Sequence, residues 1–281
     1  MAAVVGRVPS PGVQGVKYAA NGASRAFDPD SQSKQGDASC QSRARKTGLP
    51  GPLPDHHYKS IGFMRTLLSM FFALAFFATH LPAQELLFQD DFKDGLGPGW
   101  SWIREHREAW RATRRGLEVR IEAGNMWGPA NNAKNVLVRP APDVTTKEVE
   151  VSVQVENQPT NQYEQVDLVW YYNDSNMVKL GEELVDGKLS VVMGREEQDK
   201  TRTVAIIPFF STSVGLRLFV KGNQIRGQFR PANTKEWRDA GQCYLPVPKD
   251  ESAKISLQFY QGSEKVEHWA RVTEFRIRQT P

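Results

Sequence analysis

The sequence predicts an all-β fold, in which two antiparallel sheets pack face to face as a jelly-roll sandwich. From residue 85 onward apolar and polar residues alternate with a period of two, as they do in strands that bury one face. No segment keeps a period of 3.6 over ten residues; residues 103–115 come closest and can form a turn or two. Many short strands separated by turn residues are typical of sandwiches and jelly rolls.

The clearest strand is residues 148–156, EVEVSVQVE, which places four valines on one face. Residues 214–221 and 224–230 form a hairpin across the two-residue turn Gly222-Asn223, and Asp186-Gly187 is a second turn of this kind. The remaining expected strands are residues 86–92, 117–123, 135–139, 165–172, 177–184, 188–193, 201–206, 255–260 and 273–278.

The first 63 residues differ from the rest of the chain. They are rich in Gly, Ser, Ala, Pro and Gln and show no sustained apolar period, so we expect residues 1–63 to be disordered. The alternative is an upstream segment that is wrongly assigned to the protein, with Met64 as the functional start.

Residues 64–83 have the pattern of a signal peptide. A positive charge at Arg65 precedes the apolar run 67–78, and a Pro82-Ala83 pair then offers a small residue for cleavage. The run of about 12 residues is shorter than the ~20 that span a bilayer, so we expect no stable membrane span. The expected product is residues 84–281, one domain that is secreted, periplasmic or at the cell surface. A single membrane anchor with a cytoplasmic tail is the alternative.

Charge and cysteine content limit the partners of this domain. The whole chain carries a formal charge of +4, but from Gln84 onward 27 Lys and Arg face 28 Asp and Glu, a net charge of about −1. We therefore expect no nucleic-acid partner, since such a partner needs a clustered basic surface. Cys40 lies upstream of the expected cleavage site, which leaves Cys243 without a disulfide partner.

Four segments in order carry a family resemblance: DDFKDGLGPGWSW from Asp90, GLEVRIEAGNMWG from Gly116, NVLVRPAP from Asn135 and DLVWYYNDSNMVKLGEEL from Asp167. The chain resembles the concanavalin A-like jelly-roll family labelled domain of unknown function 1349. It is similar also to the C-terminal sandwich domain of family 43 β-xylosidases. The resemblance covers about residues 85–280 and implies two curved antiparallel sheets, in or beside carbohydrate-active proteins. It transfers no catalytic residue.

A candidate ligand-binding face follows from strand pairing. A loop at residues 173–176 places Trp170 opposite Lys179, and the turn at Asp186-Gly187 places Glu183 opposite Ser190. Residues that face each other across two strands share one side of the sheet. The residues expected on one solvent-reachable face are therefore Trp170, Tyr172, Lys179 and Glu183, together with Gly181 and Gly194.

This combination suits sugar recognition, because a flat aromatic ring packs on the C–H face of a sugar and polar groups bind its hydroxyls. Trp170 is the expected stacking plate, and the two glycines leave room above the sheet. Trp127, in a loop rich in Gly and Asn, is a further expected contact at the rim. The alternative is that Trp170 packs beneath a loop as a structural residue.

Hydrolysis of a glycosidic bond needs two carboxylates about 5 to 10 Å apart, and no strand presents such a pair on one face. The sequence therefore favours a non-catalytic carbohydrate-binding module whose partner is a polysaccharide or glycan. The alternatives are a glycoside hydrolase or polysaccharide lyase with an unrecognised site, and a cell-surface protein-interaction module.

No cofactor is expected. No His cluster is present from residue 84 onward, which argues against zinc. Asp90, Asp91 and Asp94 are candidates for a structural calcium site, and a solvated acidic turn is the alternative.

Overall fold

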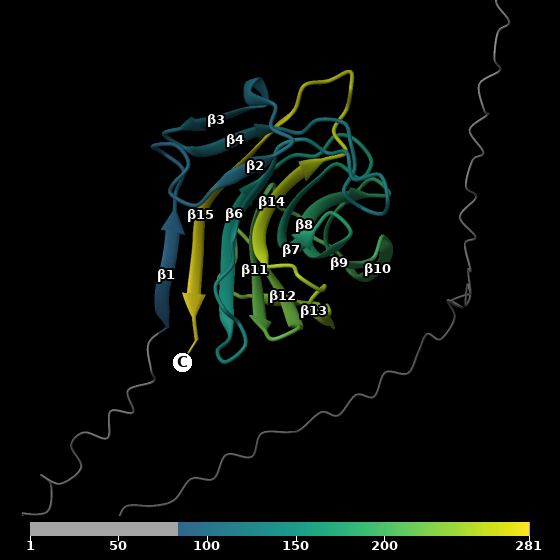
Figure 1. The fold of residues 1–281 in the computed structure, drawn as a ribbon. Coiled ribbons are helices and arrows are strands. Elements are labelled where there is room, and N and C mark those ends of the chain that lie inside the picture. Colours follow the sequence, from purple (N-terminus) through teal and green to yellow (C-terminus); the bar gives the residue numbers. More distant parts are fainter. Residues whose placement is uncertain (1–83, 281) are drawn as a thin grey trace, which may run out of the picture. The chain divides into compact units, whose positions relative to one another are not determined.

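The structure, a computed structural model, describes residues 84–280 (Figure 1). The segment predicted to be disordered and the predicted signal peptide lie outside the described residues. The strands are β1 (Glu85–Asp90), β2 (Ser101–Ile103), β3 (Trp110–Thr113), β4 (Gly116–Arg120), β5 (Val136–Pro140), β6 (Val149–Glu156), β7 (Gln165–Asn173), β8 (Asn176–Val185), β9 (Lys188–Glu197), β10 (Lys200–Pro208), β11 (Ser213–Lys221), β12 (Gln224–Pro231), β13 (Arg238–Tyr244), β14 (Lys254–Tyr260) and β15 (Trp269–Gln279). One 3₁₀ turn, η1 (Arg107–Ala109), is the helical element of the described residues.

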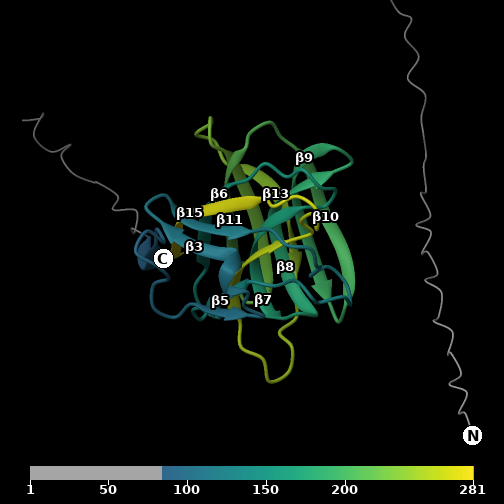
Figure 2. The ribbon, with the colours of Figure 1, turned by 90° about the horizontal axis from the view of Figure 1, so that it is seen from above.

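The strands form two antiparallel sheets, and the predicted all-β sandwich is confirmed (Figures 1 and 2). The eight-stranded sheet has the order β13-β12-β11-β6-β15-β4-β3, and β1 pairs with the second half of β15. The seven-stranded sheet has the order β10-β9-β8-β7-β14-β5-β2. In the described part of the chain no helix is long and apolar enough to cross a membrane.

The main core lies between the two sheets. Its eight-stranded side is made largely of valines and leucines from β6 and β11, among them Val151, Val153, Leu216 and Leu218, all at most 3% exposed. The period of two predicted this, because the alternating polar residues of β6 point away from the core. A second, smaller apolar cluster forms on the outer side of the seven-stranded sheet; its buried members are Met126, Ala133, Val136, Val138, Val169, Tyr171, Met177 and Tyr260.

The β8–β9 hairpin has the predicted register. Val185 pairs with Lys188 across Asp186 and Gly187, whose φ angles of 50° and 71° fit the two-residue turn. Glu183 lies opposite Ser190, as the sequence predicts, and the same turn places Lys179 opposite Gly194.

The β7–β8 pair departs from the predicted register by one residue. At the tip Asn173 pairs with Asn176, but a bulge at Tyr172 intervenes, and beyond it Tyr171 pairs with Met177. One extra residue in a strand moves every later side chain to the opposite face. As a result Trp170 pairs with Val178 rather than with Lys179.

Candidate functional site

The predicted aromatic plate is not on the outer face. Trp170 and Tyr172 are 1% and 3% exposed and belong to the core between the sheets, so their predicted solvent-reachable position is wrong. The bulge at Tyr172 is the physical reason, because it turns the alternate residues of β7 inward. Trp170 is a packing residue of the core, which was the alternative interpretation of the sequence.

The same bulge turns Gln165 and Asp167 of β7 outward. The outer side of the seven-stranded sheet carries a group of polar residues that we call the polar floor: Gln165, Asp167, Lys179, Glu183, Glu196, Ser256, Gln258 and Tyr260. Each of these residues is at most 7% exposed. Lys179 and Glu183 were predicted for this face, whereas the other six come from β7, β9 and β14.

Lys179 occupies the centre of the polar floor. Its Nζ donates a hydrogen bond of 3.0 Å to Glu183 Oε2 and a second hydrogen bond to Gln165 Oε1. The ammonium group also lies 4.9 Å from the centre of the Trp127 ring, within the range of a cation–π contact. Three of the predicted residues, Trp127, Lys179 and Glu183, are therefore brought together.

Trp127 forms a roof over the sheet at Gly194. A Cβ atom built on Gly194 would lie 2.5 Å from Cη2 of the indole, so the ring rests on the bare backbone of β9. The backbone N–H of Gly128 donates to Glu196 Oε2 at 3.0 Å and ties the loop of residues 124–133 to the floor. The room predicted above Gly194 is thus filled by the protein's own tryptophan.

Gly181 serves the same purpose for an acidic side chain. A Cβ atom on Gly181 would lie 1.7 Å from Oδ1 of Asp167, which shows that this carboxyl group lies across the glycine. Any larger residue at position 181 would displace Asp167 from the polar floor.

Two carboxyl groups of the floor have raised pKa values. Burial raises the pKa of Asp167 to about 6, against the opposing influence of the nearby Lys179. Burial also raises the pKa of Glu196 to about 7, although the Gly128 N–H lowers it in part. Perturbed carboxyl groups on one face are common at functional sites. The bulge also brings Asp167 to the same face as Glu183, which the predicted register did not allow.

Several buried atoms of the polar floor have no hydrogen-bond partner among the described residues. They are both carboxylate oxygens of Asp167, Glu196 Oε1, Ser256 Oγ, Gln258 Oε1 and the Tyr260 hydroxyl oxygen. The Tyr260 hydroxyl is close enough to Asp167 to affect its pKa, but the two groups do not meet hydrogen-bond geometry. Unpaired buried polar groups are rare and cost about 1–3 kcal/mol each. A ligand with hydroxyl groups could satisfy both donors and acceptors here.

Two open grooves lie elsewhere on the domain. One of about 410 Å³ contains Trp269 and the alternating charges Arg111, Glu118, Arg271 and Glu156. Glu118 pairs with Arg111 at 2.7 Å and with Arg271 at 3.1 Å, and the Arg111 guanidinium lies 4.4 Å from the Trp269 ring. The charges and the indole face of this groove are thus largely engaged with one another.

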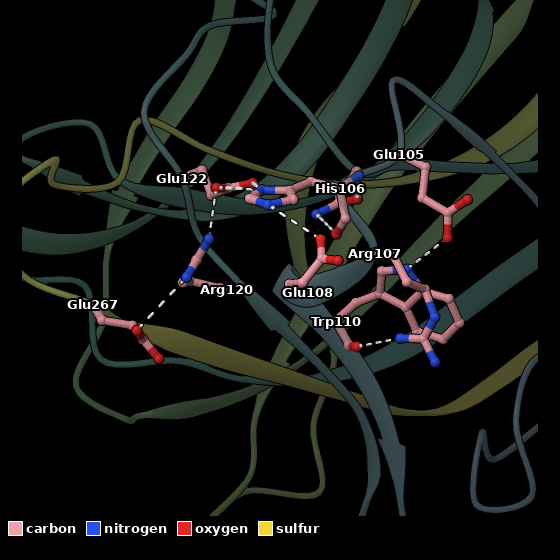
Figure 3. Close-up of polar contacts among 9 residues, drawn as sticks. Glu105, His106, Arg107, Glu108, Trp110, Arg120, Glu122 and Glu267 are labelled. Atoms are coloured by element: carbon pink, nitrogen blue, oxygen red, sulfur yellow. Dashed lines mark hydrogen bonds and ion pairs between the residues drawn. The ribbon is translucent and has the colours of Figure 1, made fainter.

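The second groove, of about 540 Å³, lies beside the loop from β14 to β15. Figure 3 shows the ion pairs at its edge: Arg120 contacts Glu122 at 2.9 Å and Glu267 at 3.6 Å, and His106 Nδ1 contacts Glu122 at 2.8 Å. These contacts join the segment before η1, the end of β4 and the loop from β14 to β15. In the sequence His106 has no neighbouring histidine, and its ion pair with Glu122 was not predicted.

The acidic turn after β1 does not have the geometry of a calcium site. Asp90 Oδ1 accepts the Phe92 N–H at 2.7 Å, and Asp90 Oδ2 accepts N–H groups of Gly97 and Trp100 at 2.8 and 3.0 Å. Asp91 pairs with Lys93 at 2.8 Å. Carboxylates that accept hydrogen bonds from N–H groups brace a loop, and within residues 84–280 no group of three acidic, His or Cys side chains is arranged to hold a metal.

Comparison with known proteins identifies the family. Residues 89–270, about two thirds of the chain, match the family described as the beta xylosidase C-terminal concanavalin A-like domain. The chain belongs to this family, and the predicted resemblance to family 43 β-xylosidases is confirmed. The resemblance to domain of unknown function 1349 stays a prediction. No curated protein sequence matches the chain.

Two solved structures with the same fold are larger proteins, of which this chain matches only a part. The family 43 glycoside hydrolase protein BlXynB from Bacillus licheniformis has 17% sequence identity and a TM-score of 0.59, over 67% of this chain and 38% of that one. The xyloglucan-locus protein GH43B of Bacteroides ovatus has 19% identity and a TM-score of 0.58, over 70% and 39%. At these identities the likeness shows the fold alone, and the chain corresponds to well under half of either protein.

Proposed function

We propose that this chain is a secreted, non-catalytic module that binds a neutral carbohydrate on the polar floor, beneath Trp127. The observation that carries the proposal is the group of buried and unpaired polar atoms on the outer side of the seven-stranded sheet. Sugar hydroxyls both donate and accept hydrogen bonds, and so could satisfy this mixed set of groups. Membership of a carbohydrate-related family supports the same class of ligand.

Binding at this place requires movement of the roof. Trp127 occupies the space above Gly194, so the 124–133 loop must lift before a sugar ring can reach Lys179 and Glu183. Positive φ angles at Gly124 (132°) and Gly128 (82°) give this loop two glycine positions that flank Trp127. Once the loop is lifted, the indole is free to pack against the ring it admits.

The test is a comparison of glycan binding by the full chain and two variants. Calorimetry with xylan and xyloglucan oligosaccharides should show binding by the wild type, because proteins of similar fold are named for these two sugars. Trp127→Ala should weaken it about tenfold or more, in line with the loss of an aromatic anchor. Tyr244→Ala is the matched control, because Tyr244 is 54% exposed on β13 of the other sheet. Equal loss in both variants, or binding unaffected by Trp127→Ala, would contradict the site.

A glycoside hydrolase is the second candidate, and the carboxyl groups of Asp167, Glu183 and Glu196 on one face favour it. A catalytic acid needs a raised pKa, and that of Glu196 is about 7. Release of reducing sugar from the same oligosaccharides by the wild type, and its loss in Glu196→Gln with binding retained, would establish the enzyme in place of the binding module.

A further inference from the structure

The outer side of the eight-stranded sheet carries a concentration of arginines that we call the arginine face: Arg217, Arg226, Arg230, Arg276 and Arg278. They come from β11, β12 and β15, and the registers of these strands and β6 set them in neighbouring cross-strand rows. The first row runs across four strands in the order Arg226, Phe219, Glu150 and Arg278. In the next row Ser152 lies between Arg217 and Arg276. Arg230 lies opposite Gly215 in the third row.

Two aromatic rings hold these guanidinium groups in place. The guanidinium carbon of Arg226 lies 4.2 Å from the centre of the Phe219 ring. Those of Arg217 and Arg230 lie 4.0 and 4.9 Å from the centre of the Trp237 ring. A guanidinium that is packed on a ring keeps its N–H edges available for an anion, and it loses less freedom when it binds.

The acidic groups nearby do not balance the arginines. Glu150 is shared by Arg217 at 3.8 Å and Arg278 at 3.4 Å, while Asp239 and Glu274 pair with Arg226 and Arg276. Arg230 has no ion-pair partner among residues 84–280. The pKa of Arg217 is lowered, first by burial and then by repulsion from Arg226, Arg230 and Arg278, with Glu150 opposing. Five cations and three anions in one patch leave a local positive excess, in a domain whose charge is close to zero.

A small hollow opens in the arginine face above Gly215. It has a volume of about 40 Å³, and its lining includes Arg230, Arg276, Trp237, Gln154 and Ser152. The carboxylate of Glu274 also lines the hollow and pairs with Arg276 Nη1 at 2.9 Å. The hollow exists because residue 215 has no side chain: a Cβ atom there would lie 3.3 Å from the Trp237 ring. A cavity of this size admits a group of a few heavy atoms.

We propose that the arginine face binds an acidic polysaccharide, with one carboxylate or sulfate group seated in the hollow between Arg230 and Arg276. Arg230 has no ion-pair partner among residues 84–280, and Arg276 engages Glu274 through Nη1, so its other N–H groups are left to join Arg230 in donating charge-assisted hydrogen bonds to the anion. The proposal rests on carbohydrate binding as the function of the chain, which is why a glycan is the occupant argued here rather than a nucleic acid. It adds a second site, on the sheet opposite the polar floor, with a ligand of different charge.

The test measures binding of the full chain to heparin, which carries sulfate groups, and to polygalacturonate, which carries carboxylates. Single-stranded poly(dT) is one comparison polymer. Neutral xylan is the other; we expect it to bind the polar floor with little dependence on salt, because it carries no charge. The acidic polysaccharides should bind, and their affinity should fall when sodium chloride is raised from about 0.05 to 0.5 M, because salt screens exposed charges. Binding to one of the two acidic polymers alone supports the proposal and identifies the anionic group.

Three variants locate the site. Arg230→Gln and Arg276→Gln should each weaken binding of the acidic polymer about tenfold, the effect of losing one charged hydrogen bond. Gly215→Ala keeps every charge but fills the hollow, and it should weaken binding to a similar degree. Arg202→Gln is the matched control, because it removes one exposed arginine from β10 of the other sheet.

The outcomes are distinct. Absence of binding to both acidic polymers, or equal effects of Arg230→Gln and Arg202→Gln, would overturn the proposal. Equal affinity for poly(dT), lost in Arg230→Gln, would assign the face to nucleic acid instead. Failure of the polar-floor site would show separately, as neutral-sugar binding that Trp127→Ala leaves unchanged. Thermal melts of each variant establish that it is folded.

Discussion

The indole of Trp127 lies directly on Gly194, at a separation that leaves no room for a Cβ atom on the glycine. This contact fixes the position of the loop over the polar floor, since Gly194 pairs with Lys179 and the Lys179 ammonium faces the same indole. A glycine in the middle of a strand ordinarily weakens it. Here Gly194 makes room for the Trp127 ring, and the packing of the loop against the sheet offsets the loss of strand stability.

The first prediction follows from this contact. Gly194→Ala should destabilise the domain by about 1–3 kcal/mol, the usual cost of overpacking, because the methyl group must displace the indole. In a Trp127→Ala background the same change should cost much less. Urea denaturation of the four proteins of this double-mutant cycle measures the coupling. Additive effects of the two substitutions would show that the indole does not rest on Gly194.

The second prediction concerns the buried pair of Lys179 and Glu183, whose side chains are 3% and 9% exposed. Lys179→Met leaves the Glu183 carboxylate buried without its cation, and should cost about 3–5 kcal/mol of unfolding free energy. Adding Glu183→Gln removes the unpaired buried carboxylate, so the double variant should regain part of the lost unfolding free energy. A cost below about 1 kcal/mol for Lys179→Met would indicate that water reaches the pair.

The register of the β8–β9 hairpin could be predicted from the sequence because its turn is a local signal. Asp186 and Gly187 both accept positive φ angles, and a two-residue turn determines which residues face each other. Lys179 and Glu183 were placed on the correct face for this reason. The bulge at Tyr172 has no such local signal in the sequence, and it shifts the pairing of β7 with β8 by one residue. Because the bulge was not predicted, Trp170 was wrongly placed on the candidate face and Asp167 was wrongly left out of it.

The sequence also failed to reveal three strands, β2, β3 and β13, although it did predict β10, which lies at another sheet end. β2, β3 and β13 each lie at an end of a sheet, where one side has no strand partner, and their sequences show little apolar alternation. The arginine face was hidden for a different reason. Its members lie up to 61 positions apart, and the near-zero total charge gives no indication that a fold can gather them on one surface.

The third prediction concerns pH. Because the pKa of Asp167 is raised in the folded state to about 6 from an ordinary value of 3.8, the folded domain holds this proton more tightly than the unfolded chain. Its contribution to stability is full below about pH 4 and is lost as the pH rises through about 6, by on the order of 3 kcal/mol. Asp167→Asn should therefore flatten the decline between pH 4 and 7 in urea titrations. An unchanged slope would assign the pH dependence to other groups.

The last prediction decides the position of Trp170. The side chain is 1% exposed within the main core, so Trp170→Ala should cost about 3–5 kcal/mol and lower the melting temperature by roughly 10 °C. Trp170→Phe should cost less, because it keeps an aromatic ring in the core and removes an indole N–H that has no partner among the described residues. Phe210→Ala is the control: that side chain is 94% exposed, and its loss should change the unfolding free energy by less than about 0.5 kcal/mol. If Trp170→Ala proved as mild as Phe210→Ala, Trp170 would be a surface residue, and the inward rotation caused by the bulge at Tyr172 would be wrong.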